Sequence, residues 1–222
     1  MATPRASAAG ERTGSGPGPS LAGRWRSLLS PAVQSPRVGP MKTRTPATVE
    51  DLYRVPEDAK AEIVNGELVL MSPTGALPSL ASGAIYASLR RHQHTVGGGT
   101  AYPNNSAFIV TLPNRRSFSP DAAFHRSTTR TMKFVEGAPV LAAEVRSECD
   151  YGPKAEEAMA RKRADYFAAG TLVVWDVDLL GEDVVRVHRA GQAEPTVYRR
   201  GQEAEAEPAV PGWRMSVDEL FE

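Results

Sequence analysis

The chain contains 222 residues, 41% of them hydrophobic, and its 26 Lys and Arg balance 26 Asp and Glu to a formal net charge of zero. A chain of this length fits one domain with an appended tail. Cys149 is the single cysteine, which excludes an internal disulfide framework and a cysteine-based zinc site and suits a reducing cytoplasm.

Residues 1–40 differ in composition from the rest of the chain. They are interrupted throughout by Gly, Pro and Ser and hold five Arg and one Glu, so we expect a disordered tail. The segment that begins at Met41 looks like a natural protein start, in which case the tail is an over-extended gene start. The alternative is a genuine flexible arm. Residues 41–222 are expected to form the folded domain.

The charge and hydropathy of residues 41–222 limit the kinds of partner that this part of the chain is expected to bind. It holds 21 Lys and Arg against 25 Asp and Glu, a net charge of −4. This balance counts against nonspecific binding of nucleic acid, unless part of the acidic excess serves to hold a metal. No apolar run approaches the roughly 20 residues that a bilayer span requires. We therefore expect a cytoplasmic protein that does not cross a membrane.

The first predicted elements are a short helix, a hairpin and a longer helix. Thr48 precedes an acidic first turn, which predicts a helix that stops near Pro56. The dipeptide Asn65-Gly66 accepts positive φ twice and separates two apolar runs, which predicts a two-residue β-hairpin over 61–71. Apolar residues then recur at helical spacing from Ser79 to His92, ahead of a glycine triplet at 97–99.

The second half predicts a sheet that continues on both sides of a helix. Three strands are expected at Ala107–Leu112, Phe118–Phe124 and Val140–Val145, followed by a helix at Lys154–Ala168 and a buried strand at Leu172–Val177. The connection from 145 to 172 is long enough for a parallel return. An antiparallel pair, Asp183–Arg189 with Thr196–Tyr198, and a closing helix at Val217–Phe221 complete the chain. The predicted fold class is α/β, a mixed sheet flanked by helices.

Two acidic residues interrupt otherwise apolar strands. Asp121 follows Pro120, and Glu144 lies within Val140–Val145. Burying an unpaired charge costs several kcal/mol, so such residues are expected to be paired or to bind a cation. A hard divalent cation would remove the repulsion between two converging carboxylates. The alternatives are a turn-forming role for Asp121 and an edge-strand position for Glu144.

The triplet Glu144-Val145-Arg146 resembles E-x-K with an arginine at the cationic position, because strand alternation puts Glu144 and Arg146 on one face. Arginine is a poor proton carrier, since its pKa stays above roughly 12. A lysine elsewhere in the chain is therefore expected to take the catalytic role of the lysine in E-x-K.

Several motifs in order resemble one known family. These are 62–69 (EIVNGELV), 71–74 (MSPT), Pro120-Asp121, 144–147 (EVRS), Lys162 followed by Tyr166, and 175–178 (WDVD). Together they look like the bacterial "putative restriction endonuclease" family of the PD-(D/E)XK nuclease superfamily. The resemblance covers almost all of 41–222 and implies a restriction endonuclease-like core.

The resemblance implies a site and a reaction. Asp121 and Glu144, with the backbone carbonyl of Val145, would ligate Mg²⁺, for which Mn²⁺ can substitute. Lys162 would orient or help deprotonate the attacking water and would stabilise the charge of the phosphorane. Three further residues are candidates for catalytic roles: Glu62 as an additional carboxylate, Tyr166 as a residue that positions Lys162, and Arg146. The alternative without a catalytic role is that Lys162 lies on a solvent-exposed face of the helix, because Arg161 and Arg163 flank it.

The expected function is metal-dependent hydrolysis of phosphodiester bonds, with DNA as the expected partner and a homodimer as the form suited to double-strand cutting. The chain departs from the family pattern at Gly75–Ser79, where a histidine commonly follows the Ser-Pro segment. This departure, together with Arg146, keeps a second hypothesis open. It is a catalytically weakened domain of the same fold that binds nucleic acid or another protein.

Overall fold

The computed structural model describes residues 45–56 and 59–222. The expected tail, residues 1–40, lies outside the described residues. The main feature is a six-stranded sheet with the order β11-β10-β9-β8-β6-β3. Its strands are β3 (Thr100–Tyr102), β6 (Ala122–His125), β8 (Leu141–Val145), β9 (Val173–Val177), β10 (Val185–Arg189) and β11 (Thr196–Tyr198).

The sheet is mixed, as predicted. Strands β8 and β9 run parallel and every other neighbouring pair is antiparallel. Helix α3 (Pro153–Ala168) makes the crossover between β8 and β9. This is the arrangement that the long connection from 145 to 172 predicted, because a parallel return needs an intervening element.

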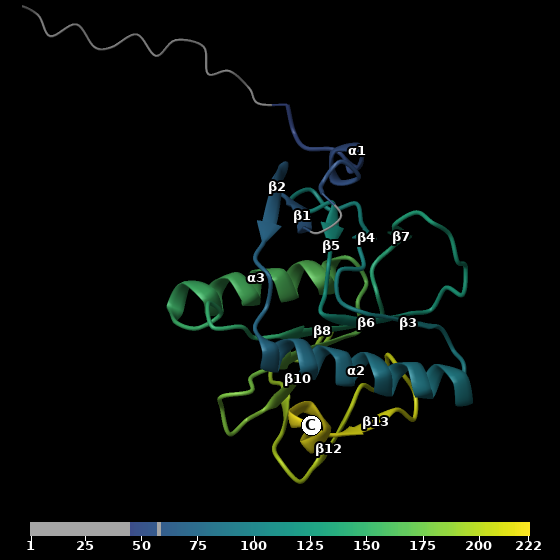
Figure 1. Ribbon diagram of the computed structural model, residues 1–222, viewed down its shortest axis with the longest axis vertical. Coiled ribbons are helices and arrows are strands. Elements are labelled where there is room, and N and C mark those ends of the chain that lie inside the picture. Colours follow the sequence, from purple (N-terminus) through teal and green to yellow (C-terminus); the bar gives the residue numbers. More distant parts are fainter. Residues whose placement is uncertain (1–44, 57–58) are drawn as a thin grey trace, which may run out of the picture. The chain divides into compact units, whose positions relative to one another are not determined.

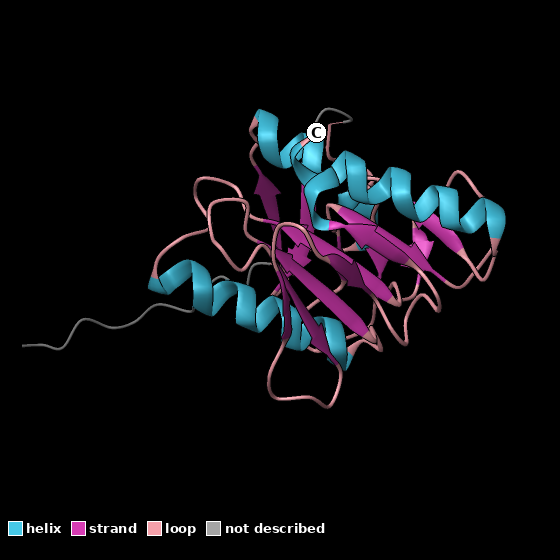
Figure 2. Cartoon of the chain, turned by 90° about the horizontal axis from the view of Figure 1, so that it is seen from below, coloured by secondary structure: helices cyan, strands magenta, loops and turns pink. Residues whose placement is uncertain are grey.

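Two helices cover opposite faces of the sheet, as Figures 1 and 2 show. Helix α2 (Ala76–Thr95) contributes Ile85 and Leu89 to a core that includes Leu141, Ala143 and Val145 of β8. Helix α3 contributes Tyr166 to a second core that includes Ala142 of β8. Successive side chains of a strand point to opposite faces. Glu144, two residues after Ala142, therefore lies on the α3 face.

The predicted hairpin is present as β1 (Lys60–Val64) and β2 (Glu67–Met71), and the turn residues Asn65 and Gly66 have φ of 51° and 74°. The hairpin docks through hydrogen bonds of Ile63, whose N–H donates to Ser117 Oγ over 2.8 Å and whose carbonyl accepts from the Arg116 N–H over 3.0 Å. Helix α1 (Val49–Leu52) precedes it, and Thr48 caps it by accepting from the N–H of Asp51. The local turn and cap signals were thus sufficient for this region.

Small elements complete the described chain. A three-stranded sheet contains β5 (Ser117–Phe118), β4 (Phe108–Ile109) and β7 (Val135–Glu136). Strands β12 (Glu203–Glu205) and β13 (Arg214–Ser216) form a second hairpin, and the 3₁₀ helix η1 (Val217–Phe221) packs against α2. Within 45–56 and 59–222, no helix has both the length and the apolar content needed to cross a bilayer.

The structure differs from the sequence prediction between 100 and 125. The strand expected at Ala107–Leu112 shortens to β4 and lies outside the main sheet, whose edge strand is instead β3. The strand expected at Phe118–Phe124 breaks into β5 and β6. Pro120 lies at the break, and a proline has no N–H with which to continue a ladder. The break places Asp121 immediately before the first residue of β6.

Candidate active site

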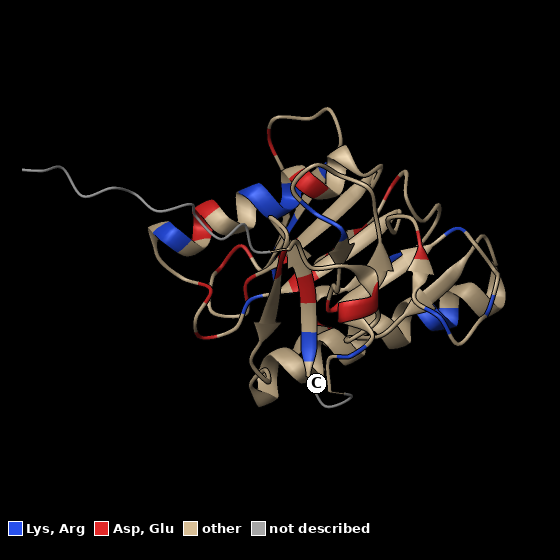
Figure 3. Ribbon diagram, turned by 90° about the horizontal axis from the view of Figure 1, so that it is seen from above, with Lys and Arg blue, Asp and Glu red and all other residues tan. Residues whose placement is uncertain are grey.

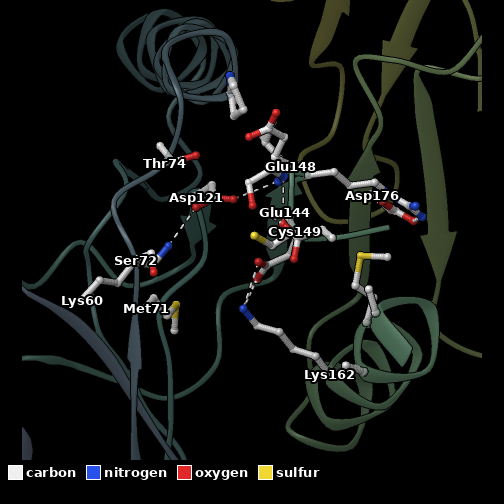
Figure 4. A pocket seen from close by; sticks show the side chains of 18 of the residues that line it. Lys60, Met71, Ser72, Thr74, Asp121, Glu144, Glu148, Cys149, Lys162 and Asp176 are labelled. Carbon is white, nitrogen blue, oxygen red and sulfur yellow. Dashed lines mark hydrogen bonds and ion pairs between the residues drawn. The ribbon is translucent and has the colours of Figure 1, made fainter. Parts of the chain in front are cut away.

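Asp121 and Glu144 come from neighbouring strands and lie on the same side of the sheet. In the antiparallel register of β6 and β8, Ala122 lies opposite Ala143, so Asp121 comes beside Glu144. Both residues line one cavity (Figure 4), and the charge of Asp121 raises the pKa of Glu144. The two carboxylates that the sequence singled out are therefore brought together.

Asp121 is held by a backbone amide and a lysine. Its Oδ2 accepts from the N–H of Val145 over 2.9 Å, and its Oδ1 lies 2.8 Å from Nζ of Lys60. The Lys60 ammonium also donates to Oδ1 of Asn104 over 2.8 Å. The expected alternative of a turn-forming Asp121 describes its backbone position in the bend before β6. Its side chain, however, faces the cavity and its charges.

Glu144 accepts from two donors of α3. Nζ of Lys162 lies 2.9 Å from Oε2, and the hydroxyl of Tyr166 donates to Oε1 over 2.6 Å. Burial raises the pKa of Glu144, and the nearby charges of Asp121 and Glu62 add to this effect, whereas Lys162 opposes it. A carboxylate in this position is stabilised by any further positive charge that reaches it.

Lys162 links the helix to the hairpin. Its Nζ lies 3.0 Å from Oε1 of Glu62 as well as 2.8 Å from Oε1 of Glu144. Burial alone would lower the pKa of Lys162, but the two carboxylates outweigh it and raise this pKa above its usual value. The adjacent Arg161 is exposed and pairs with Glu157 on the helix surface. Lys162 therefore does not belong to a solvated face.

Glu62 is buried and pairs with a second cation, Arg115. Its Oε2 lies 2.5 Å from Nη1 of Arg115, and its Oε1 accepts from the N–H of Ser119 over 2.9 Å. Arg115 in turn pairs with Asp165 of α3 over 2.8 Å. Although burial would raise the pKa of Glu62, Lys162 and Arg115 lower it overall. Glu62 is thus an ionised anchor between the hairpin and α3.

Tyr166 and Arg146 line the same cavity, but their partners differ from those that the sequence suggested. The Tyr166 hydroxyl contacts Glu144 rather than Lys162, whose Nζ lies 5.9 Å from the centre of the tyrosine ring. Arg146 is buried and makes a two-pronged contact with Asp176, from Nε to Oδ1 over 2.7 Å and from Nη2 to Oδ2 over 2.8 Å. It also pairs with Glu156 at the start of α3. These contacts occupy the arginine with carboxylates other than Asp121 and Glu144.

The charged residues line a cavity of about 1420 Å³ between the hairpin, the first turn of α2, the segment after β8, and α3. Figure 4 shows Lys60 approaching Asp121 from the hairpin side and Lys162 approaching Glu144 from the helix. The segment Gly75–Pro78, which overlaps the place where the family pattern commonly carries a histidine, lines the same cavity. In Figure 3, basic and acidic segments are interspersed.

The donor set at Asp121 and Glu144 suits a hard cation. Two carboxylates and the carbonyl of Val145 offer oxygen ligands only, which Mg²⁺ and Mn²⁺ prefer. In the described part of the chain, no group of three or more His, Cys, Asp or Glu is arranged to hold a metal. The two carboxylates would therefore leave several positions on the ion for water or substrate oxygens, and Mg²⁺ commonly keeps several waters. The residues present fit the ion.

Sequence reasoning missed Lys60, Asn104, Arg115 and Asp165. Lys60 could have been found, because it lies two residues before Glu62 in a strand and so shares its face. Asp165 follows Lys162 at helical spacing and shares its side of α3. For Arg115 and Asn104 the sequence carries no local signal, since both lie in connections whose partners are 53 and 44 residues away.

Comparisons with known proteins identify the fold and the family of the chain. The chain resembles a crystal structure described as a putative nuclease of the DUF820 family from Anabaena variabilis ATCC 29413. The TM-score is 0.63 at 17% sequence identity, and the match covers 79% of this chain and 98% of the other. This likeness establishes a shared fold. A comparison with curated proteins finds no match. The model of the Uma2 family, described as "Putative restriction endonuclease", matches residues 47–218, so this protein is a member of that family.

Proposed function

We propose that this protein is a metal-dependent endodeoxyribonuclease, a hydrolase that cuts phosphodiester bonds of DNA with Mg²⁺ or Mn²⁺. Membership of the "Putative restriction endonuclease" family and the nuclease-like fold support the reaction class. The single observation that carries the proposal is the cluster in which Asp121 and Glu144 lie side by side with the ammonium group of Lys162 against Glu144.

The proposed division of roles follows from the contacts. Asp121, Glu144 and the Val145 carbonyl would hold the ion, and the chemistry that Mg²⁺ supplies when bound is polarisation of the phosphoryl oxygens and activation of a water. Lys162 would stabilise negative charge that develops on the phosphate, because its ammonium lines the cavity beside Glu144. Glu62 and Tyr166 would fix the positions of Lys162 and Glu144.

Lys162 is better suited to charge stabilisation and orientation than to proton abstraction. Its ammonium donates to carboxylates of both Glu62 and Glu144, and an ammonium has no lone pair with which to accept a proton. Of the roles expected for Lys162, this geometry therefore favours orienting the attacking water and stabilising charge over deprotonating the water. The side of the cavity formed by Gly75–Pro78 provides no imidazole to act as a base.

A cleavage assay with plasmid DNA tests the proposal. Purified protein should nick or linearise plasmid with Mg²⁺ or Mn²⁺ and should be stopped by EDTA. Asp121→Ala and Glu144→Ala should each lower the cleavage rate by about 100-fold or more. Circular dichroism should show that both variants retain the fold. Glu157→Gln is the matched control, since Glu157 is an exposed acid of α3 that pairs with Arg161 on the helix surface. Unchanged cutting by both alanine variants would defeat the proposal.

A noncatalytic interaction module remains the second candidate function, and the surface of β2 favours it. Leu68, Val69 and Leu70 are 36%, 44% and 65% exposed, and consecutive exposed apolar residues on a strand are typical of an interaction surface. This candidate predicts binding without turnover, so the plasmid assay separates the two. The homodimer stays a prediction, which sedimentation of the purified chain would check.

A further inference from the structure

Lys60 brings a second lysine to the carboxylate pair. Its Nζ lies 2.8 Å from Oδ1 of Asp121, and the two side chains are only 16% and 17% exposed. The same ammonium donates to Oδ1 of Asn104 over 2.8 Å. Asn104 is in turn fixed by the N–H of Asn105, which donates to the same oxygen over 2.7 Å. Lys60 thus has one charged and one neutral acceptor, on different segments of the cavity wall.

Every oxygen of the carboxylate pair already has a donor. On Asp121 these are Lys60 for Oδ1 and the Val145 N–H for Oδ2. On Glu144 they are Tyr166 for Oε1 and Lys162 for Oε2. A divalent cation that binds Asp121 therefore arrives beside an ammonium already in contact with that carboxylate, and like charges at such a separation repel strongly.

Of the two donors on Asp121, only Lys60 can withdraw at little cost. The Val145 N–H belongs to the backbone of β8 and is fixed by the sheet. The lysine ammonium lies at the end of a four-carbon flexible stem, and Asn104 gives it an acceptor that remains when Asp121 is taken. The charge would then stay on the cavity wall rather than be left without a partner.

We propose that Lys60 is a tethered counter-ion of Asp121, which competes with the divalent cation for this carboxylate and withdraws towards Asn104 when the cation binds. The inference rests on the proposed function in requiring a divalent cation at Asp121 and Glu144. Lys60 is then a residue that sets metal affinity, and its released ammonium faces the cavity in which a phosphate would lie.

The direction of the change in metal affinity separates competition from a structural role. Lys60→Met keeps most of the aliphatic stem and removes the charge. If Lys60 competes, this variant binds the ion more tightly. If Lys60 only props Asp121 in place, the variant loosens Asp121 and binds the ion more weakly. Lys60→Arg keeps the charge and should behave like the wild type.

The experiment is a Mn²⁺ titration of the full chain, in which electron paramagnetic resonance measures the free ion. Lys60→Met should lower the Kd for Mn²⁺ by about 5-fold or more, because a charge in direct contact with the ligand is removed. Lys60→Arg should stay within about 2-fold of the wild type. Lys154→Met is the matched control, because it removes the same charge from the lining of the same cavity and should change the Kd by less than about 2-fold. Asp121→Asn should lose the site.

The possible results distinguish a failure of this inference from a failure of the proposed function. Weaker or unchanged Mn²⁺ binding by Lys60→Met, with wild-type binding that depends on Asp121, overturns the competition and leaves the proposed function standing. Equal tightening by Lys60→Met and Lys154→Met also overturns it, because a general charge effect is then sufficient. Absence of Asp121-dependent binding from the wild type and Lys60→Met alike overturns both. If Lys60→Met does not fold, Lys60→Gln replaces it in the same titration, because it also removes the charge.

Discussion

The ammonium group of Lys162 lies 3.0 Å from the carboxylate of Glu62, so helix α3 and the hairpin β1–β2 meet at the charged centre. The two residues are 100 positions apart in sequence. Because Lys162 also contacts Glu144, the hairpin, the sheet and the helix are connected through one side chain. A change at Lys162 is therefore expected to affect both the chemistry of the site and the packing of these elements against one another.

Lys162→Met should reduce DNA cleavage by about 100- to 1,000-fold, because it removes the charge that would stabilise the developing negative charge of the phosphate. The rate is measured by single-turnover nicking of plasmid under saturating Mg²⁺. Arg161→Met is the control, since Arg161 is exposed and pairs on the helix surface. Similar rates for the two variants would remove Lys162 from the proposed mechanism.

Tyr166→Phe should lower the cleavage rate by about 10-fold, in line with the value of a hydrogen bond to a charged group. The change deletes only the hydroxyl that donates to Oε1 of Glu144 over 2.6 Å. The ring, which stacks on Phe118 at 4.0 Å between centroids, remains. The rate should therefore fall while the thermal unfolding midpoint changes little. A large loss of stability without a loss of rate would show that the hydroxyl serves the core alone.

Arg146→Met should destabilise the protein by about 3–5 kcal/mol, because it leaves Asp176 buried without its partner. The side chains of the pair are only 5% and 8% exposed. Arg199→Met is the contrasting variant, since its pair with Asp183 is largely exposed and should contribute at most about 1 kcal/mol. Urea-induced unfolding measures both. A stable Arg146→Met protein that has lost cleavage would instead support the catalytic role expected from the sequence.

His188 should make the protein less stable in mild acid. Burial lowers its pKa to about 4 from the usual 6.5, and the cations Arg163, Arg186 and Arg146 add to this effect against Asp176. Its Nε2 is buried without a hydrogen-bond partner in the described part of the chain. As the pH falls from 6.5 towards 4, the unfolded chain binds a proton that the folded chain excludes, so the free energy of unfolding falls. Above pH 6.5 both states are neutral and the contribution vanishes.

The measurement for His188 is urea-induced unfolding at about pH 7.5 and about pH 5, with His188→Gln as the comparison. The wild type should lose of the order of 1 kcal/mol more than the variant between these conditions. Carboxylates that titrate in the same range contribute equally to both proteins and cancel in the difference. Identical losses would show that His188 is not responsible.

The parts of the fold that sequence predicted are those set by local chemistry. Asn65-Gly66 predicted the hairpin because few dipeptides tolerate two positive φ values, and the observed angles are 51° and 74°. Strand alternation placed Glu144 and Arg146 on one face, and both line the cavity. The break after Phe118 is not predicted by hydropathy, because apolar residues lie on both sides of it; Pro120, which lacks an N–H, is its local cause.

The contacts that sequence could not predict depend on the packing of distant segments. Arg146 looked like a substitute for a catalytic lysine, but the parallel register puts Asp176 of β9 opposite Glu144, and the arginine binds that carboxylate. The pairing of Lys60 with Asp121 joins residues 61 positions apart. Neither register nor docking follows from spacing along the chain, since both are set by the way the sheet, the hairpin and α3 pack.

The central claim is that Asp121 and Glu144 together hold one divalent ion. The most direct measurement is the anomalous difference map of a crystal soaked in Mn²⁺. The account predicts a single strong peak within coordination distance of an oxygen of each carboxylate and of the Val145 carbonyl, and no such peak in Asp121→Asn crystals. Mn²⁺ bound elsewhere, with Asp121 still bound to Lys60 and the Val145 N–H and Glu144 still bound to Lys162 and Tyr166, would contradict it.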